Sequence, residues 1–150
     1  LRPEVTTEPL TPEEASIHAG FTVLMPHNLP KWEGFIYNSW PRQVTIIGMI
    51  DQRYSVDIKQ LLLDSQQDRE FPVGNTEVMK ISVRGQTGYW IEGVTTNIVR
   101  EAYQHLEDRA WHLNKNNILI WEEGNIVYII YGHPNLSRLE MLDIAEALSP

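Results

Sequence analysis

The chain has 150 residues and no cysteine, and its 12 basic and 20 acidic side chains give a net charge of −8. A chain of this length fits one domain with an ordinary core. The lack of cysteine excludes disulfides, a thiolate zinc site and a cysteine nucleophile. The acidic balance repels phosphate backbones, so nucleic acid is not expected as a partner. No apolar run reaches the roughly 18 residues that a membrane-spanning helix needs.

The N-terminal residues, 1–10, are rich in proline, threonine and glutamate, which leaves little to bury. We interpret them as a flexible linker, and residues 11–150 as a single α+β domain. The first residue is Leu1 and not methionine, so the chain is expected to be a piece of a longer protein. Contact with a membrane is expected only through a segment that this chain lacks.

The first element predicted is a short helix. Thr11 can cap it, Pro12 suits its first position, and Glu14 lies three residues after the cap. Gly20 can end it in the left-handed conformation. Strands are then predicted over 35–37, 44–50 and 55–63, where Gly48 is consistent with a β-bulge.

Further strands are predicted over 78–84, 89–91, 116–121 and 126–131. We expect residues 85–88 to form a turn and Gly93 to end the strand that begins at Tyr89. The sequence Glu-Gly-Asn at 123–125 is typical of a tight hairpin turn. Trp90 and Trp121 fall within strand patterns and are expected in the core.

Helical spacing of apolar residues appears twice more. The spacing is only moderately regular over residues 98–113, so the sequence leaves open whether this segment is a helix or a strand. Residues 137–148 begin with a capping box, Ser137 to Glu140, and carry an apolar stripe. The fold class predicted is therefore α+β: a curved antiparallel sheet of about six to eight strands with helices packed on one face, a short N-terminal helix and an amphipathic C-terminal helix.

One group of side chains has the residue types of a metal site. If 98–113 is helical, one face of that helix carries Glu101, His105, Asp108 and His112. Polar faces of amphipathic helices often look like this, and a straight helix face rarely supplies four ligands to one ion. These four are weak candidates, and we expect a solvated face and no metal. The sequence has no phosphate-binding loop and no nucleophile elbow, so no cofactor and no catalytic residue are predicted.

Two tryptophans are the candidates for binding a ligand or a partner. Trp32 and Trp40 fall in proline-flanked segments that we interpret as loops. A loop tryptophan can anchor a partner or line a ligand groove. It can equally fold over the edge of the core, and both interpretations stay open.

Four motifs, in order, resemble those of one family. They are Ala-Gly-Phe at 19–21 followed by Pro26 and Leu29-Pro30, Gly-Tyr-Trp-Ile-Glu-Gly at 88–93, Asn-Ile-Leu-Ile-Trp-Glu at 117–122 with Tyr128, and Leu-Asp-Ile-Ala-Glu-Ala-Leu at 142–148. The family is an uncharacterised bacterial domain found outside the membrane, at the C-terminal end of anti-sigma-factor-like single-span proteins. Two features depart from the family pattern. Ala147 stands where relatives usually have serine, and residues 95–115 lack the glycine-containing hairpin expected in relatives.

The resemblance implies an extracytoplasmic domain, tethered to the cell membrane in the full-length protein, that senses or regulates without catalysis. Its partner is then a protein or a small hydrophobic ligand. The sheet is also distantly similar to those of periplasmic lipoprotein carriers, which is an analogy of fold alone. Three alternatives stay open: a periplasmic or extracellular carrier of lipid or another hydrophobic ligand, a small hydrolase with an Asp/Glu/His site, and a purely structural spacer.

Overall fold

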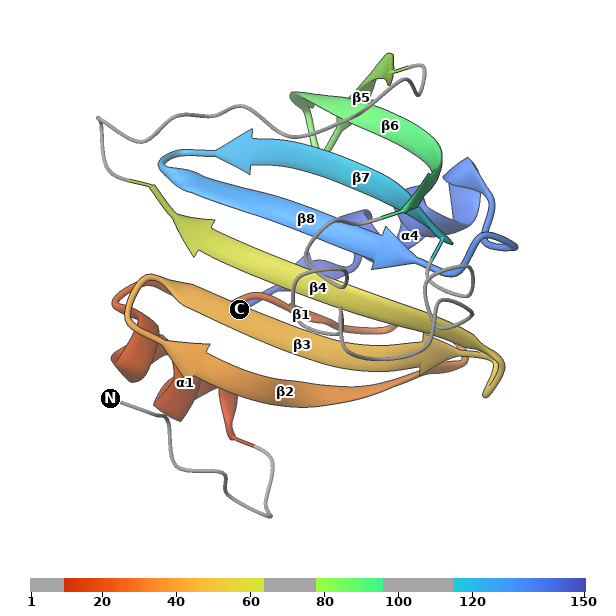
Figure 1. The fold of residues 1–150 in the computed structure, drawn as a ribbon. Coiled ribbons are helices and arrows are strands. Elements are labelled where there is room, and N and C mark those ends of the chain that lie inside the picture. Colours follow the sequence, from red (N-terminus) through yellow and green to blue (C-terminus); the bar gives the residue numbers. More distant parts are fainter. Residues whose placement is uncertain (1–9, 64–77, 96–114) are drawn as a thin grey trace, which may run out of the picture.

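The computed structural model describes residues 10–63, 78–95 and 115–150 (Figure 1). Seven strands form one antiparallel sheet in the order β2-β3-β4-β8-β7-β6-β5. Their bounds are β2 Trp32–Trp40, β3 Gln43–Ile50, β4 Tyr54–Leu62, β5 Val78–Val83, β6 Gln86–Thr95, β7 Lys115–Glu123 and β8 Ile126–Gly132. The sheet thus consists of two runs of consecutive strands, β2–β4 and β5–β8, joined where β4 pairs with β8.

The remaining elements are α1 (Pro12–Ala19), α4 (Arg138–Glu146) and a two-stranded pair of β1 (Met25–Pro26) with β9 (Leu148–Ser149). In Figure 1 both helices and β1 lie behind the sheet. We call the sheet face that they cover the inner face and the opposite one the outer face. Among the described residues no helix is long and apolar enough to cross a membrane.

The ends of both helices follow from local sequence. The Thr11 side chain accepts a hydrogen bond from the backbone N–H of Glu14, and Gly20 ends α1 with φ at 84°. Ser137 and Glu140 form the reciprocal capping box of α4. These two predicted helices and their caps are confirmed, as is the hairpin turn between β7 and β8 at Gly124.

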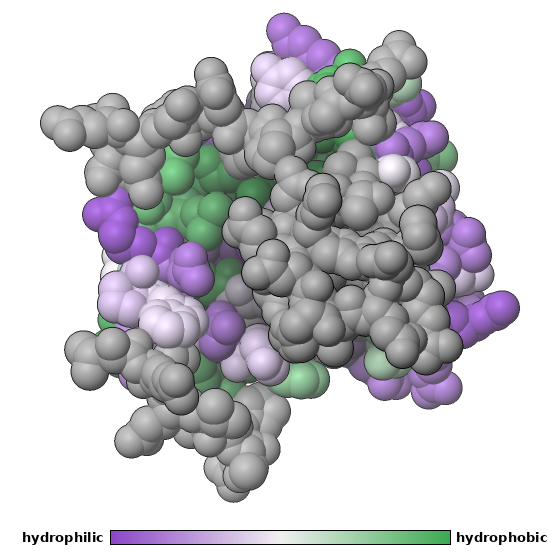
Figure 2. Space-filling model, in the orientation of Figure 1, coloured by the Kyte–Doolittle hydropathy of each residue, from purple (hydrophilic) through white to green (hydrophobic). Residues whose placement is uncertain are grey.

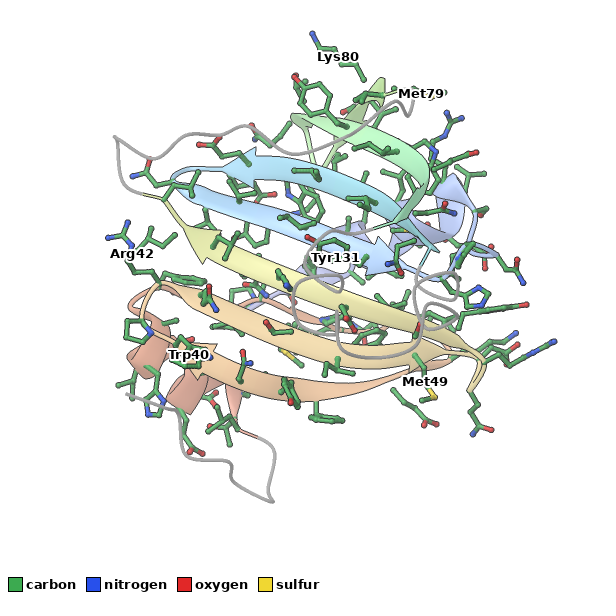
Figure 3. The ribbon with its side chains drawn as sticks, in the orientation of Figure 1. Trp40, Arg42, Met49, Met79, Lys80 and Tyr131 are labelled. Atoms are coloured by element: carbon green, nitrogen blue, oxygen red, sulfur yellow. The ribbon has the colours of Figure 1, made fainter. Side chains whose placement is uncertain are left out.

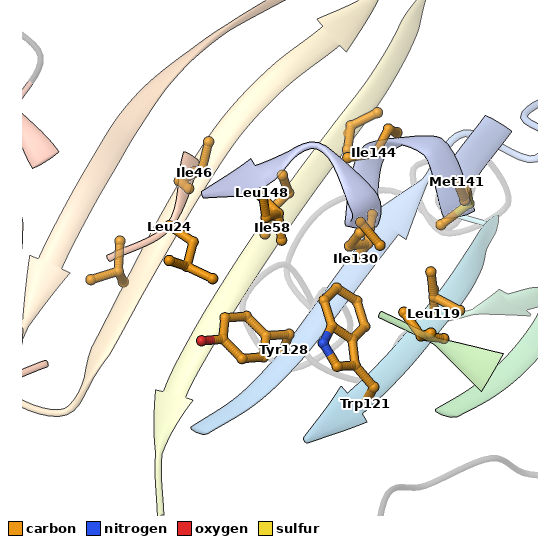
Figure 4. Close-up of a cluster of buried hydrophobic side chains, with 14 of the residues drawn as sticks. Leu24, Ile46, Ile58, Leu119, Trp121, Tyr128, Ile130, Met141, Ile144 and Leu148 are labelled. Carbon is orange, nitrogen blue, oxygen red and sulfur yellow. The ribbon is translucent and has the colours of Figure 1, made fainter. Parts of the chain in front are cut away.

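The main core lies between the inner face and the segments that cover it (Figure 4). Strand residues Ile46, Ile58 and Ile130 are fully buried there against Ile144 and Leu148. Trp121 and Tyr128 face each other across β7 and β8 with stacked rings, 5.2 Å between centroids. Trp90 and Trp121 are both buried, so their predicted place in the core is confirmed.

Three buried polar side chains tie the covering segments to the sheet. The Gln60 amide accepts from the backbone N–H of Leu24 at 3.0 Å and donates to the carbonyl of Leu24 at 2.8 Å. Ser39 donates to the carbonyl of Ala15. Asn117 donates to two carbonyls that precede α4 and accepts from a backbone N–H of β6. The backbone N–H and C=O groups of a segment that crosses a sheet face cannot pair with a neighbouring strand. These three side chains supply hydrogen-bond partners for some of those groups.

The predicted α+β class is wrong, because the fold is dominated by its sheet. The described residues contain only two short helices, of 8 and 9 residues. Much of the cover on the inner face is chain outside the two helices, which buries Val23, Leu24, Leu136 and Leu148. The third helical pattern, at 98–113, lies outside the described residues. The helical spacing of apolar residues therefore led us to overestimate the contribution of helices to the fold.

Several local predictions are also wrong. Gly48 is not a bulge, since β3 pairs in continuous register with both neighbours, and the irregularity lies in β2 between Ile36 and Asn38. The turn expected at 85–88 comes earlier, because Gln86 already pairs with Val83. Gly93 does not end β6; it has a φ of 66° at a register shift, and the strand continues to Thr95.

Candidate functional site

The two tryptophans predicted as binding residues lie in a strand and not in loops. Trp32 begins β2 and Trp40 ends it. Trp32 pairs with Ile50 and its ring packs over Gly34 and Gly48, where a Cβ atom on either glycine would meet it. Gly48, which the sequence suggested as a bulge, and Gly34 therefore leave the space that this ring occupies. Trp32 is partly buried against the main core, which favours the structural interpretation of its role.

Trp40 lies at the other end of β2 and on the other face of the sheet. It pairs with Gln43, which pairs in turn with Leu61, and Leu61 pairs with Val127. Side chains opposite each other in such a row point to the same face. The row is on the outer face because the adjacent Val44 is buried in the main core. The structure thus does not bring Trp32 and Trp40 together.

The four weak metal candidates, Glu101, His105, Asp108 and His112, lie outside the described residues. Within residues 10–63, 78–95 and 115–150, no group of three histidine, aspartate or glutamate side chains is arranged to hold a metal ion.

The outer face carries a second apolar cluster, which gives the candidate site its walls. Its buried members are Ile91, Ile118, Ile120, Val127 and Ile129, with Leu61, Leu63 and Tyr131 partly buried against them. Figure 2 looks onto this face and shows apolar surface in a hollow over the neighbouring ends of β4, β7 and β8. We call this feature the apolar hollow and assign to it the cluster members at those strand ends: Leu61, Leu63, Ile120, Val127 and Ile129.

Trp40 and Arg42 stand at the border of the apolar hollow. Figure 3 labels both at the same end of the sheet, in the orientation of Figure 2. Arg42, in the turn between β2 and β3, is exposed, and its Nε donates to the carbonyl of Leu62 at 3.2 Å. This hydrogen bond holds the guanidinium beside the last residues of β4. An aromatic ring and a cation therefore flank an aliphatic surface.

A polar cluster lies nearer the middle of the same face. Asp57 pairs with Tyr131 across β4 and β8, and the Lys59 ammonium lies 5.5 Å from the centre of the Tyr131 ring. Burial raises the pKa of Asp57, and the positive charge of Lys59 lowers it by less. Burial, together with the charge of Asp57, also raises the pKa of Tyr131. The phenol therefore stays protonated at neutral pH and, with the ammonium, offers donors to a ligand.

Replacing Asp57 with asparagine is expected to stabilise the fold at neutral pH. A carboxyl whose pKa is raised on folding favours the folded state below its ordinary value of 3.8, and this contribution is lost as pH rises through the raised value. The gain from D57N should therefore be present at pH 7 and disappear towards pH 3.5. Thermal unfolding across that range measures it, with D143N on the exposed surface of α4 as the control. An equal effect of D57N and D143N on the unfolding temperature at pH 7 would contradict a raised pKa for Asp57 in the folded state.

The outer face also exposes more apolar surface beyond the hollow. Phe35 and Tyr37 of β2 are 45% and 62% exposed, Met49 of β3 is 41% exposed and Tyr89 of β6 is 43% exposed. Sequence reasoning missed this face, although one signal was present. The run Ile126–Tyr131 is apolar at every position, which is typical of a strand covered on both faces.

Fold and site together define a class: a domain built on one antiparallel sheet, with a core on its inner face and apolar side chains on its outer face. The chain belongs to the DUF4367 family, a domain of unknown function, whose profile matches residues 50–148. That match spans β4–β8 and α4, whereas Trp40 and Arg42 precede it. Comparisons with curated proteins and with solved structures gave no match.

Proposed function

We propose that this chain is a non-enzymatic binding domain that takes an apolar ligand on the outer face of its sheet. The observation that carries the proposal is the apolar hollow with Trp40 at its border. Strand backbones there are paired with one another, so the surface offers aliphatic contact and few hydrogen-bonding groups. Leu61 and Leu63 keep part of their apolar surface accessible above the buried Ile120, Val127 and Ile129, and accessible apolar surface of this kind is typical of a binding site.

We further propose that binding serves sensing or regulation. The resemblance that places related domains outside the membrane, in bacterial anti-sigma-factor-like proteins, supports this role and an extracytoplasmic, membrane-tethered setting. Ligand binding then shifts the population between two arrangements of the domain or of its partner, by no more than the difference between the two affinities. The hydrophobic-ligand carrier shares the same binding step and differs only in what binding brings about.

Binding of the neutral dye Nile red tests the site directly. We expect saturable fluorescence enhancement with one dye per chain, because the dye becomes bright when it enters apolar surroundings. W40A should weaken binding roughly tenfold, which is about 1.4 kcal/mol, because tryptophan is enriched among the residues whose truncation costs the most binding energy. The matched control is I17A, because Ile17 is 79% exposed on α1, beyond the inner face.

Two results would refute the proposed site. One is that Nile red does not bind with saturation. The other is that W40A and I17A bind the dye equally well while both retain the circular dichroism and unfolding midpoint of the parent.

A further inference from the structure

We draw no further inference here: the strongest candidate, the exposed aromatic patch that Phe35 and Tyr37 form on the outer face of the edge strand β2, carries nothing, because nothing in the part of the chain that the structure describes shows what covers it.

Discussion

Replacing Arg84 with methionine is expected to lower the free energy of unfolding by about 3 kcal/mol, because hydrogen bonds to charged groups contribute about 1.5–3 kcal/mol each. Arg84 lies in the turn between β5 and β6, and its Nε donates to Glu123 at 2.5 Å. Its Nη1 donates to the carbonyls of Ala145 and Leu148, at 3.0 and 2.7 Å. One guanidinium therefore joins two turns of the sheet to the end of α4 and to β9.

The size of this effect depends on partial burial. The Arg84 and Glu123 side chains are 20% and 25% exposed, so the carboxylate that remains after R84M is only partly hydrated. Glu123 also accepts from the Trp121 indole, which places that carboxylate beside the core. Urea unfolding measures the loss. The free energy of unfolding of R84K should lie between those of the parent and R84M. A lysine ammonium keeps the positive charge but cannot reproduce the several N–H donors of the planar guanidinium.

The control is R138M, which removes an exposed arginine from the first turn of α4 and should change stability by less than about 0.5 kcal/mol. Equal effects of R84M and R138M would show that the Arg84 contacts contribute little. A double variant with E123Q should lose less than the sum of the two single losses, because both remove the same interaction.

Replacing Gln60 with leucine should cost a similar amount, about 3 kcal/mol, through a different cause. Gln60 is fully buried and satisfies both backbone groups of Leu24. Leucine has a similar size and no hydrogen-bonding group, so Q60L leaves a buried N–H and a buried carbonyl without partners. Each such group costs about 1–3 kcal/mol. The loss should appear in urea unfolding as a lower midpoint with an unchanged slope.

Amide hydrogen exchange gives Q60L a second readout. The Leu24 amide should exchange faster in Q60L, whereas amides of the β4–β8 ladder should change only with global stability. The matched control is Q86L, the same substitution at an exposed position that begins β6. If Q60L is no less stable than Q86L, the Gln60 contacts do not hold the segment around Leu24 to the sheet.

The sequence predicts local structure well where neighbours in the chain decide it. Thr11, Gly20 and the Ser137–Glu140 pair mark helix ends because caps are local hydrogen bonds. Gly48 misleads for the opposite reason. Together with Gly34 it makes room for the Trp32 ring across two strands, which no local pattern encodes. The same holds for the prediction that Trp32 and Trp40 lie in loops.

The candidate site was less predictable than the fold. Trp40 was selected from the sequence, but the residues around it were not. Leu61 and Val127 share a cross-strand row with Trp40, beyond Gln43, only through the registers of β2–β3, β3–β4 and β4–β8. Register depends on which strands pair, and the pairing of β4 with β8 joins segments far apart in the chain. Whether the domain acts in sensing, and where in the cell, stays a prediction.

The ladder between β4 and β8 has a consequence for how the chain folds. Every other pairing in the sheet joins consecutive strands, whereas Leu62 pairs with Ile126, 64 positions later. Each meander can form from strands that are neighbours in the chain. Joining the two meanders requires closing a long loop, and the entropy cost of that closure is offset only when the hydrogen bonds between β4 and β8 form. The same ladder places Leu61 beside Val127. The apolar hollow is therefore absent from either half alone and is created at the step that turns two meanders into one sheet.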